Sequence, residues 1–183
     1  MRFALPLIRA SNATLRMWLV AFSVLTATVA RPFMPHATVS AQEAGIPVGE
    51  KAPGGPLETL DGKTVDLASY YGKTPVVIEF WATWCPTCKQ LEPAMRKVMT
   101  KYGAGVKFVT VAVSVNQSRQ RVAAWQKINK MPGVLLYDRS GTVSGAFDVP
   151  ATSYVVVVDK SGKVTYTGTG GTQNLDAAVK KAM

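Results

Sequence analysis

The two cysteines of this 183-residue chain are its only ones, and they are three positions apart. Cys85 and Cys88 stand in the run Trp84-Cys-Pro-Thr-Cys-Lys, with Pro86 and Thr87 between them. Two thiols at this spacing meet within one helical turn, and the arrangement lowers a thiol pKa and permits disulfide exchange. A purely structural disulfide is the alternative, but closing so short a loop gives little chain-entropy stabilisation. The pattern therefore predicts a redox-active pair.

The segments on either side of the pair predict how it would be activated. Residues 75–81 form an apolar run typical of a buried strand, and residues 85–102 have the apolar spacing of a helix. Cys85 would then lie at the first turn of this helix, where free backbone N–H groups and the helix dipole favour a thiolate. We therefore expect Cys85 to attack a target disulfide and Cys88 to resolve the mixed disulfide.

Glu79 is an ionisable residue in the middle of the apolar run. Burial disfavours the charged carboxylate and raises its pKa towards the range useful for proton transfer. The alternative is that strand alternation points this side chain to solvent, or that it forms an ordinary salt bridge. Its position six residues before Cys85 favours a role as the base that accepts the proton of Cys88.

The remaining apolar patterns alternate between strands and helices. A hairpin is expected over 57–67 with its turn at Asp61-Gly62, and a second hairpin over 153–167. The β-branched run 106–115 predicts a central strand, and residues 134–137 predict a short one. Together with the helices these elements indicate an α/β fold with a central mixed β-sheet flanked by helices and an N-terminal β-hairpin extension.

Two further helices have recognisable starts. Ser118 is expected to cap a helix that reaches about residue 130, with Val122, Trp125 and Ile128 on its inner face. Thr172 is expected to cap a final helix that ends near residue 181.

The first 41 residues read as a signal peptide or an N-terminal membrane anchor. They contain four arginines, no acidic residue, and a short apolar stretch, and residues 39–41 offer a cleavage site. We expect the rest of the chain to be exported to the periplasm or the extracytoplasmic face of the membrane. The Gly- and Pro-rich residues 42–56 then read as a linker or arm, and residues 57–183 as one domain.

Charge and histidine content argue against several other functions. Without the four leader arginines the chain has 17 basic and 11 acidic residues, and the basic ones are scattered rather than clustered. This distribution favours solvated helix faces over a nucleic-acid site. The only histidine, His36, lies in the leader, so neither Cys–His catalysis nor a closed zinc or copper site is expected.

The run from Ile78 to Lys89 resembles the active-site signature of the thioredoxin superfamily. In that family a buried acid occupies the position of Glu79, and a kink proline follows the second cysteine by five residues, as Pro93 does here. The leader, the N-terminal hairpin and the strand–helix stretch before residue 150 resemble the exported TlpA/ResA/CcmG-like branch. The resemblance covers about residues 48–183.

This resemblance implies a substrate-binding surface as well as a fold. Val149-Pro150 matches the family's cis-proline, which lies against the active-site disulfide and holds an extended substrate chain. The resemblance therefore implies a cis peptide bond before Pro150. Trp84 matches an aromatic residue near the site, and Pro86 and Thr87 border the attacking thiol. No cofactor is implied beyond the dithiol itself.

The branch also implies partners. Its members reduce disulfides of extracytoplasmic proteins, often those of apocytochrome c, and a membrane thiol reductase of the CcdA/DsbD type re-reduces them. Several of them carry Glu three residues after the second cysteine, where this chain has Leu91. The dipeptide Pro86-Thr87 does not assign a substrate either, so the cytochrome role does not follow from these residues.

Three alternatives stay open on the sequence. A disulfide oxidase or isomerase would use the same pair in the opposite direction, although oxidants usually carry His in the dipeptide. A thiol peroxidase would place Thr three residues before its cysteine, where this chain has Ala82. A non-catalytic domain could use the thioredoxin surface for binding alone.

Overall fold

The computed structural model describes residues 44–183. The predicted leader, residues 1–41, lies outside the described residues, as do the first two residues of the predicted linker. Within the described part, no helix is both long enough and apolar enough to cross a membrane.

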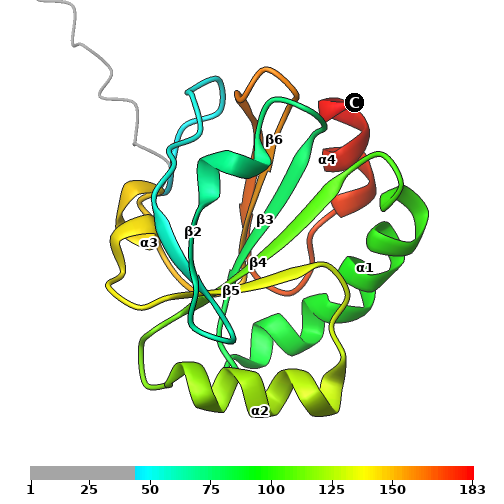
Figure 1. The fold of residues 1–183 in the computed structure, drawn as a ribbon. Helices are drawn as coiled ribbons and strands as arrows, with labels where there is room; N and C mark the ends of the chain where they lie inside the picture. Colours follow the sequence, from blue (N-terminus) through cyan, green and yellow to red (C-terminus); the bar gives the residue numbers. More distant parts are fainter. Residues whose placement is uncertain (1–43) are drawn as a thin grey trace, which may run out of the picture. The chain divides into compact units, whose positions relative to one another are not determined.

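A seven-stranded mixed sheet forms the centre of the domain (Figure 1). The strands lie in the order β2-β1-β5-β4-β3-β6-β7. Neighbours β3, β4 and β5 run parallel, whereas the pairs β1–β2, β1–β5, β3–β6 and β6–β7 are antiparallel. The strand bounds are β1 Pro56–Thr59, β2 Thr64–Asp66, β3 Val76–Trp81, β4 Lys107–Val113, β5 Val134–Asp138, β6 Tyr154–Val158 and β7 Val164–Thr169.

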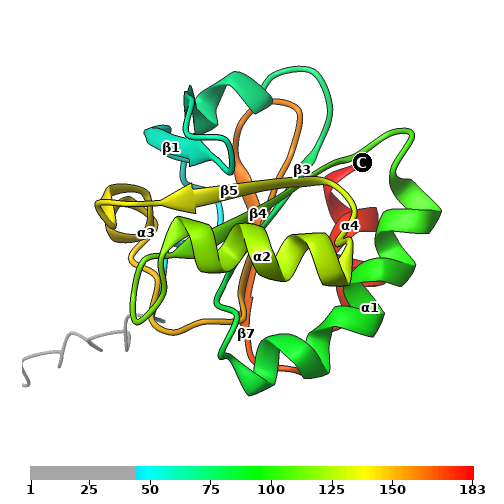
Figure 2. The same cartoon turned by 60° about the horizontal axis from the view of Figure 1, so that its bottom comes forward.

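The central strands are apolar because helices or loops cover both faces of the sheet there. All six residues of β3 and all five of β6 are buried. Val77 and Trp81 lie on one face of β3. Val77 packs with residues of α1 (Pro86–Tyr102) and α4 (Leu175–Ala182), and Trp81 packs on Trp125 of α2 (Arg119–Asn129). Phe80, on the opposite face, packs against Phe147 at the end of α3 (Thr142–Ala146). Helices α1, α2 and α4 therefore share one face of the sheet (Figure 2).

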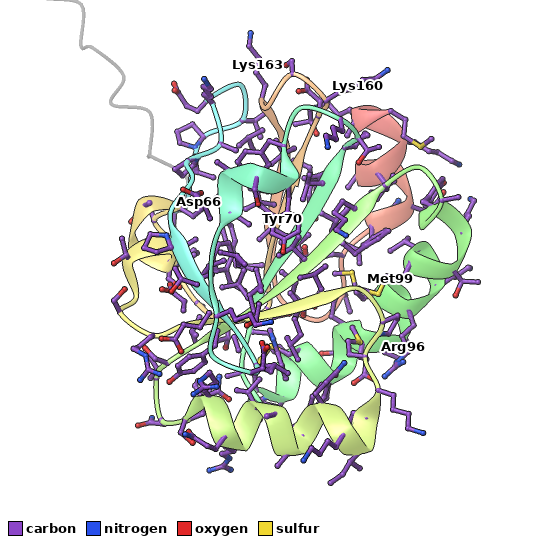
Figure 3. The ribbon with its side chains drawn as sticks, viewed as in Figure 1. Asp66, Tyr70, Arg96, Met99, Lys160 and Lys163 are labelled. Carbon is purple, nitrogen blue, oxygen red and sulfur yellow. A yellow bond between two sulfur atoms is a disulfide. The ribbon has the colours of Figure 1, made fainter. Side chains whose placement is uncertain are left out.

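Helix α1 joins this layer to α2 through one arginine. Met99 of α1 is buried, whereas Arg96 lies at the surface of the same helix (Figure 3). Arg96 donates to the carbonyl oxygen of Asn129, 2.8 Å away, and pairs with Glu92 one turn earlier. Glu92 also lines a cavity beside Cys88, so this contact holds one wall of that cavity in place.

The structure confirms the predicted α/β architecture and the two hairpins, and it corrects two details of the helices. Ile128 does not face the core: it is 80% exposed, whereas Val122 is buried. Asn174, not Thr172, caps α4, since its side chain accepts the backbone N–H of Ala177. A short 3-10 helix, η1 (Leu67–Tyr70), and α3 were not expected from the sequence.

The described part of the predicted linker lies along the domain. Ile46 and Ala52 are buried, and their backbone N–H groups donate to the carbonyl oxygens of Phe147 and Gly162 at 3.0 and 2.9 Å. The isolated bridge between Lys51 and Lys163 continues this edge. Any segment that spaces the domain from a membrane would therefore have to precede residue 46.

The cap of α4 can be tested by stability measurements. Asn174→Ala removes the side-chain acceptor of an otherwise free N–H group at the start of the helix, and we expect a loss of about 0.5–2 kcal/mol in the free energy of unfolding. Thr172→Ala should change this free energy by less than about 0.5 kcal/mol, because Thr172 makes no capping bond. Urea unfolding of both variants checks this expectation, and equal losses would contradict the assignment of the cap.

Candidate active site

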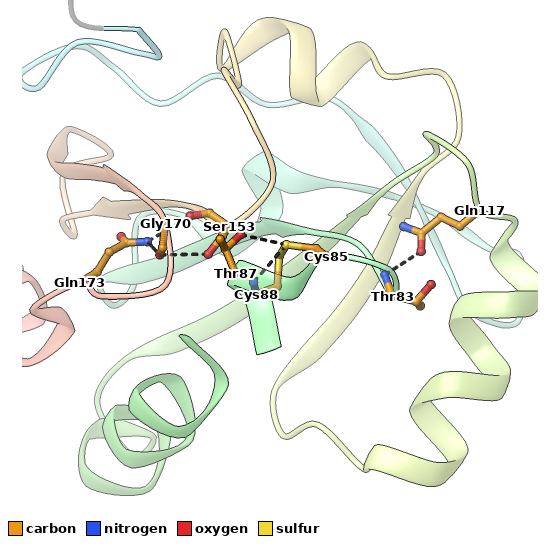
Figure 4. The surroundings of a disulfide bond; sticks show 8 residues. All are labelled: Thr83, Cys85, Thr87, Cys88, Gln117, Ser153, Gly170 and Gln173. Atoms are coloured by element: carbon orange, nitrogen blue, oxygen red, sulfur yellow. Dashed lines mark hydrogen bonds between the residues drawn. A yellow bond between two sulfur atoms is a disulfide. The ribbon is translucent and has the colours of Figure 1, made fainter. Parts of the chain in front are cut away.

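Cys85 and Cys88 form a disulfide at the junction where β3 has ended and α1 begins (Figure 4). Cys85 is the N-cap of α1, and its backbone is still extended, with φ −79° and ψ 113°. Pro86 occupies the first turn, where its missing N–H costs no hydrogen bond. The backbone N–H of Cys88 donates to the sulfur of Cys85 at 3.0 Å. A thiolate at this position would be stabilised by the same contact.

A second polar group lies beside the same sulfur. The hydroxyl oxygen of Thr87 is 3.3 Å from the sulfur of Cys85 (Figure 4). Pro86 and Thr87 are exposed, whereas Cys85 is only 1% exposed and Cys88 6%. In the oxidised form the disulfide is therefore closed off, and an approaching protein would first contact the neighbours of Cys85 rather than its sulfur.

Glu79 is buried beneath the pair, as the sequence predicts. It is 4% exposed, and in the sheet it lies between Thr110 of β4 and Val155 of β6. Burial, together with the smaller effect of the negative charge of Glu92, raises its pKa to about 8 from the ordinary value of 4.5. Such a carboxyl exchanges a proton near neutral pH, which an exposed glutamate does not.

A small cavity joins Glu79 to the inner cysteine. It has a volume of about 20 Å³ and is lined by Glu79, Cys88, Trp81, Thr83 and Glu92, among others. The indole N–H of Trp81 and the hydroxyl of Thr83 are buried and have no protein partner. A polar cavity of this size can hold one water molecule, which needs two to four such partners. The cavity therefore offers a short proton path between Cys88 and Glu79.

An apolar groove of about 400 Å³ lies on the other side of the active-site segment. Three of the residues predicted to bind substrate, Trp84, Val149 and Pro150, line it together, whereas Pro86 and Thr87 do not. Trp84 is 40% exposed, and its indole N–H donates to the carbonyl oxygen of Val115 at 2.8 Å. Val115 also lines the groove. It was not predicted as a site residue, although it is an exposed apolar residue just after a strand.

The prediction of a cis bond before Pro150 is wrong. No peptide bond among residues 44–183 is cis, so the Val149–Pro150 bond has the ordinary trans form. Pro150 is exposed in the loop that follows α3, where the turn is made by Asp148, with φ 46°, and by a bond from the N–H of Val149 to the carbonyl oxygen of Ser144. It therefore behaves as a loop proline on the rim of the groove.

Ser153, the residue immediately before β6, lies in the surroundings of the disulfide (Figure 4). It is fully buried and has a left-handed backbone, with φ 67°. Its N–H donates to the carbonyl oxygen of Phe80, and its hydroxyl donates to that of Gly170 at 3.0 Å. Gln173 donates to the carbonyl oxygens of both Ser153 and Gly170. No sequence motif pointed to this network, because its members are far apart in the chain.

The site offers no set of metal ligands. Over the described range, no group of three or more His, Cys, Asp or Glu side chains could hold a metal ion. The chemistry available at the site is that of the two sulfurs and of the carboxyl group below them.

Known proteins match most of the chain. The family model described as Redoxin matches residues 47–182. The thioredoxin-like protein YneN of Bacillus subtilis (strain 168) is 29% identical over 151 residues, which are 82% of this chain and 88% of the relative. The thiol-disulfide oxidoreductase ResA of the same organism is 32% identical over 133 residues, covering 72% and 73% of the two chains. A solved thiol:disulfide interchange protein of the thioredoxin family from Chlorobium tepidum TLS superposes with a TM-score of 0.63 at 27% identity, covering 73% of this chain and 96% of that one.

The buried carboxyl of Glu79 predicts how stability depends on pH. Between pH 4.5 and about 8 the folded chain keeps a proton on Glu79 that the unfolded chain has lost, so the free energy of unfolding falls as the pH rises through this window. Glu79→Gln cannot ionise, and its stability should fall less over the same window. Urea unfolding of the oxidised proteins at pH 5, 7 and 9 measures the difference. The exposed Glu50, changed to Gln, serves as the control, and parallel pH profiles for wild type and Glu79→Gln would contradict the assignment.

The hydroxyl of Thr87 predicts a second effect, on the attacking thiol. Thr87→Val keeps the shape of the side chain but removes a donor to the Cys85 thiolate, a loss of about 1 kcal/mol, or about fivefold. We expect the pKa of Cys85 to rise and its alkylation by iodoacetamide at pH 7 to slow by about this factor, with no change at high pH. Equal rates at pH 7 would show that this hydroxyl does not stabilise the thiolate.

Proposed function

The chain belongs to the Redoxin family and is a thiol–disulfide oxidoreductase of the thioredoxin superfamily, similar to the TlpA and ResA type, and from this we propose that it reduces disulfides of proteins outside the cytoplasm. The observation that carries the proposal is the Cys85–Cys88 pair at the N-terminus of α1, directly above the cavity of Glu79. The nucleophile and the resolving thiol lie within one helical turn of α1, and the proton acceptor Glu79 lies on β3 beneath them.

The reaction proceeds in two exchanges. The thiolate of Cys85 attacks one sulfur of the target disulfide, forming a mixed disulfide and releasing the other target sulfur as a thiolate. The ionised form of Glu79, which is present in part near neutral pH because its pKa is about 8, then accepts the proton of Cys88 through the cavity. The Cys88 thiolate attacks the sulfur of Cys85. The second target sulfur leaves, so the target gains two electrons and the protein ends in the disulfide form that the structure shows.

The residues around Cys85 favour reduction over oxidation. A strongly oxidising pair is one whose reduced form is stabilised, chiefly through its thiolate. Here the dipeptide Pro86-Thr87 carries no positive charge. Among residues 44–183, the donors to the sulfur of Cys85 are neutral groups, the N–H of Cys88 and the hydroxyl of Thr87. A weakly stabilised thiolate supports a low midpoint potential and hence a reductant.

The apolar groove supports a protein substrate. Its exposed apolar side chains, among them Trp84 and Val115, can take up apolar residues of an extended polypeptide that flanks the target cysteine. Val149 and Pro150 form the facing rim. Pro86 and Thr87 are exposed next to Cys85 and complete the surface that the target would contact.

The location and the electron donor are inferred from the sequence pattern. Residues 1–41 would direct export or anchor the chain, and residues 57–183 would act as the catalytic domain. Re-reduction by a membrane thiol reductase of the CcdA/DsbD type follows from the resemblance. Disulfides of apocytochrome c are one candidate substrate class of this branch.

The midpoint potential of the Cys85–Cys88 pair tests the direction of electron flow. Equilibration of the purified chain in graded thiol–disulfide buffers should give a value near that of thioredoxin, about −270 mV. A value near that of the strong oxidants, about −120 mV, would instead make the protein a disulfide donor.

Cys85→Ala should abolish the reduction of insulin by dithiothreitol that the wild type catalyses. An active Cys85→Ala variant would contradict the role of this thiol.

A further inference from the structure

Gln117 is a buried polar residue in the loop between β4 and α2, and nothing in the mechanism above uses it. It is 8% exposed, although the loop around it lies at the surface. Its side-chain oxygen accepts the backbone N–H of Thr83 at 2.9 Å (Figure 4). Its side-chain nitrogen donates to the carbonyl oxygen of Val113 at 2.6 Å. One amide group therefore ties the end of β4 to the segment that leads into Cys85.

The loop that carries this amide is itself held in place. The hydroxyl of Tyr137, a buried residue of β5, donates to the carbonyl oxygen of Gln117 at 3.0 Å. Asn116 has a left-handed backbone, with φ 53°, and Ser118 caps α2 by accepting the N–H of Arg121. Contacts with β5 and α2 thus position the amide of Gln117 that binds the active-site segment.

On the other side of the contact, the segment from Thr83 to Cys85 has few other restraints. The indole N–H of Trp84 donates to the carbonyl oxygen of Val115 in the same loop, and the N–H of Cys85 donates to the carbonyl oxygen of Ala82. Two of these bonds therefore run from the active-site segment to the β4–α2 loop. The one made by Gln117 is partly buried, and it acts on the peptide only two residues before the attacking cysteine.

We propose that Gln117 is a positioning residue for disulfide exchange. By holding the N–H of Thr83, it keeps Cys85 at the N-cap of α1, where the N–H of Cys88 lies 3.0 Å from its sulfur. Without this restraint the segment gains freedom, the contact from Cys88 weakens, and the Cys85 thiolate loses part of its stabilisation. The inference rests on the thiol–disulfide activity and not on the direction of electron flow.

The test compares two glutamines of the same helix region. Gln117→Met keeps the length and volume of the side chain but removes both hydrogen bonds. Gln126→Met is the matched control, because Gln126 also accepts a backbone N–H and donates to a backbone carbonyl, both of Met131, near the opposite end of α2. The readout is the pH profile of Cys85 alkylation by iodoacetamide in the reduced full-length proteins.

We expect Gln117→Met to slow alkylation at pH 7 by about threefold to tenfold, with the wild-type rate regained at high pH where the thiol is fully ionised. Gln126→Met should follow the wild-type profile. Glu79, Lys89 and Glu92 are the ionisable groups that line the cavity at the pair, and they are unchanged in both variants, so they do not account for a difference.

Two results would overturn the proposal. One is an unchanged pH profile for Gln117→Met, and the other is an equal shift in both variants, which would indicate general loosening of the fold. If Gln117→Met does not fold, Gln117→Asn replaces it, because an amide one methylene shorter cannot reach both Thr83 and Val113. The same threefold to tenfold effect is expected there, and a wild-type profile would again overturn the proposal.

Discussion

The chemistry of this protein depends on the hydrogen bond from the backbone N–H of Cys88 to the sulfur of Cys85. This bond exists because Cys85 ends the extended segment after β3 and caps α1, so its side chain faces N–H groups that have no partner within the helix. A cysteine one position earlier or later would lose the alignment. The sheet, the helix layer and the surrounding loops serve to hold this junction in place.

Burial imposes a second constraint, which the sheet satisfies at some cost. Position 79 lies on β3 between β4 and β6, where an apolar side chain would cost less free energy to bury than a carboxyl group does. Glu79 is tolerated because it stays protonated over much of the physiological range, with its pKa raised to about 8. The ion pair with Arg96 partly offsets the negative charge of Glu92 and so limits its effect on Glu79. The fold thus keeps a group near its ionisation point directly beneath the thiol that must lose a proton.

The sequence predicted the parts of this design that are local in the chain. Cys85 and Cys88, the helix after them and Glu79 lie within one short stretch, and their pattern is governed by strand and helix periodicity. The cap of α4 and the inner face of α2 were predicted wrongly. Where the chain enters α4 determines that Asn174 is its cap, and how far the core extends determines that Ile128 is exposed. Gln117 and Ser153 were missed for another reason: their partners are distant in sequence, and only the fold brings them together.

The correction at Pro150 changes how the two sides of the site are understood. Pro150 is a loop proline on the rim of the groove, whereas Ser153 lies in the surroundings of the disulfide (Figure 4), where the carbonyl groups of Phe80 and Gly170 accept its two hydrogen bonds. On the opposite side, Gln117 and Val115 hold Thr83 and Trp84. Because Trp84 and Val115 also line the groove, a polypeptide that settles there presses on the same residues that restrain the segment leading to Cys85. Under the proposed function, a bound partner would therefore contact the residues that restrain this segment as it approaches the sulfur of Cys85, which is almost completely buried in the oxidised form.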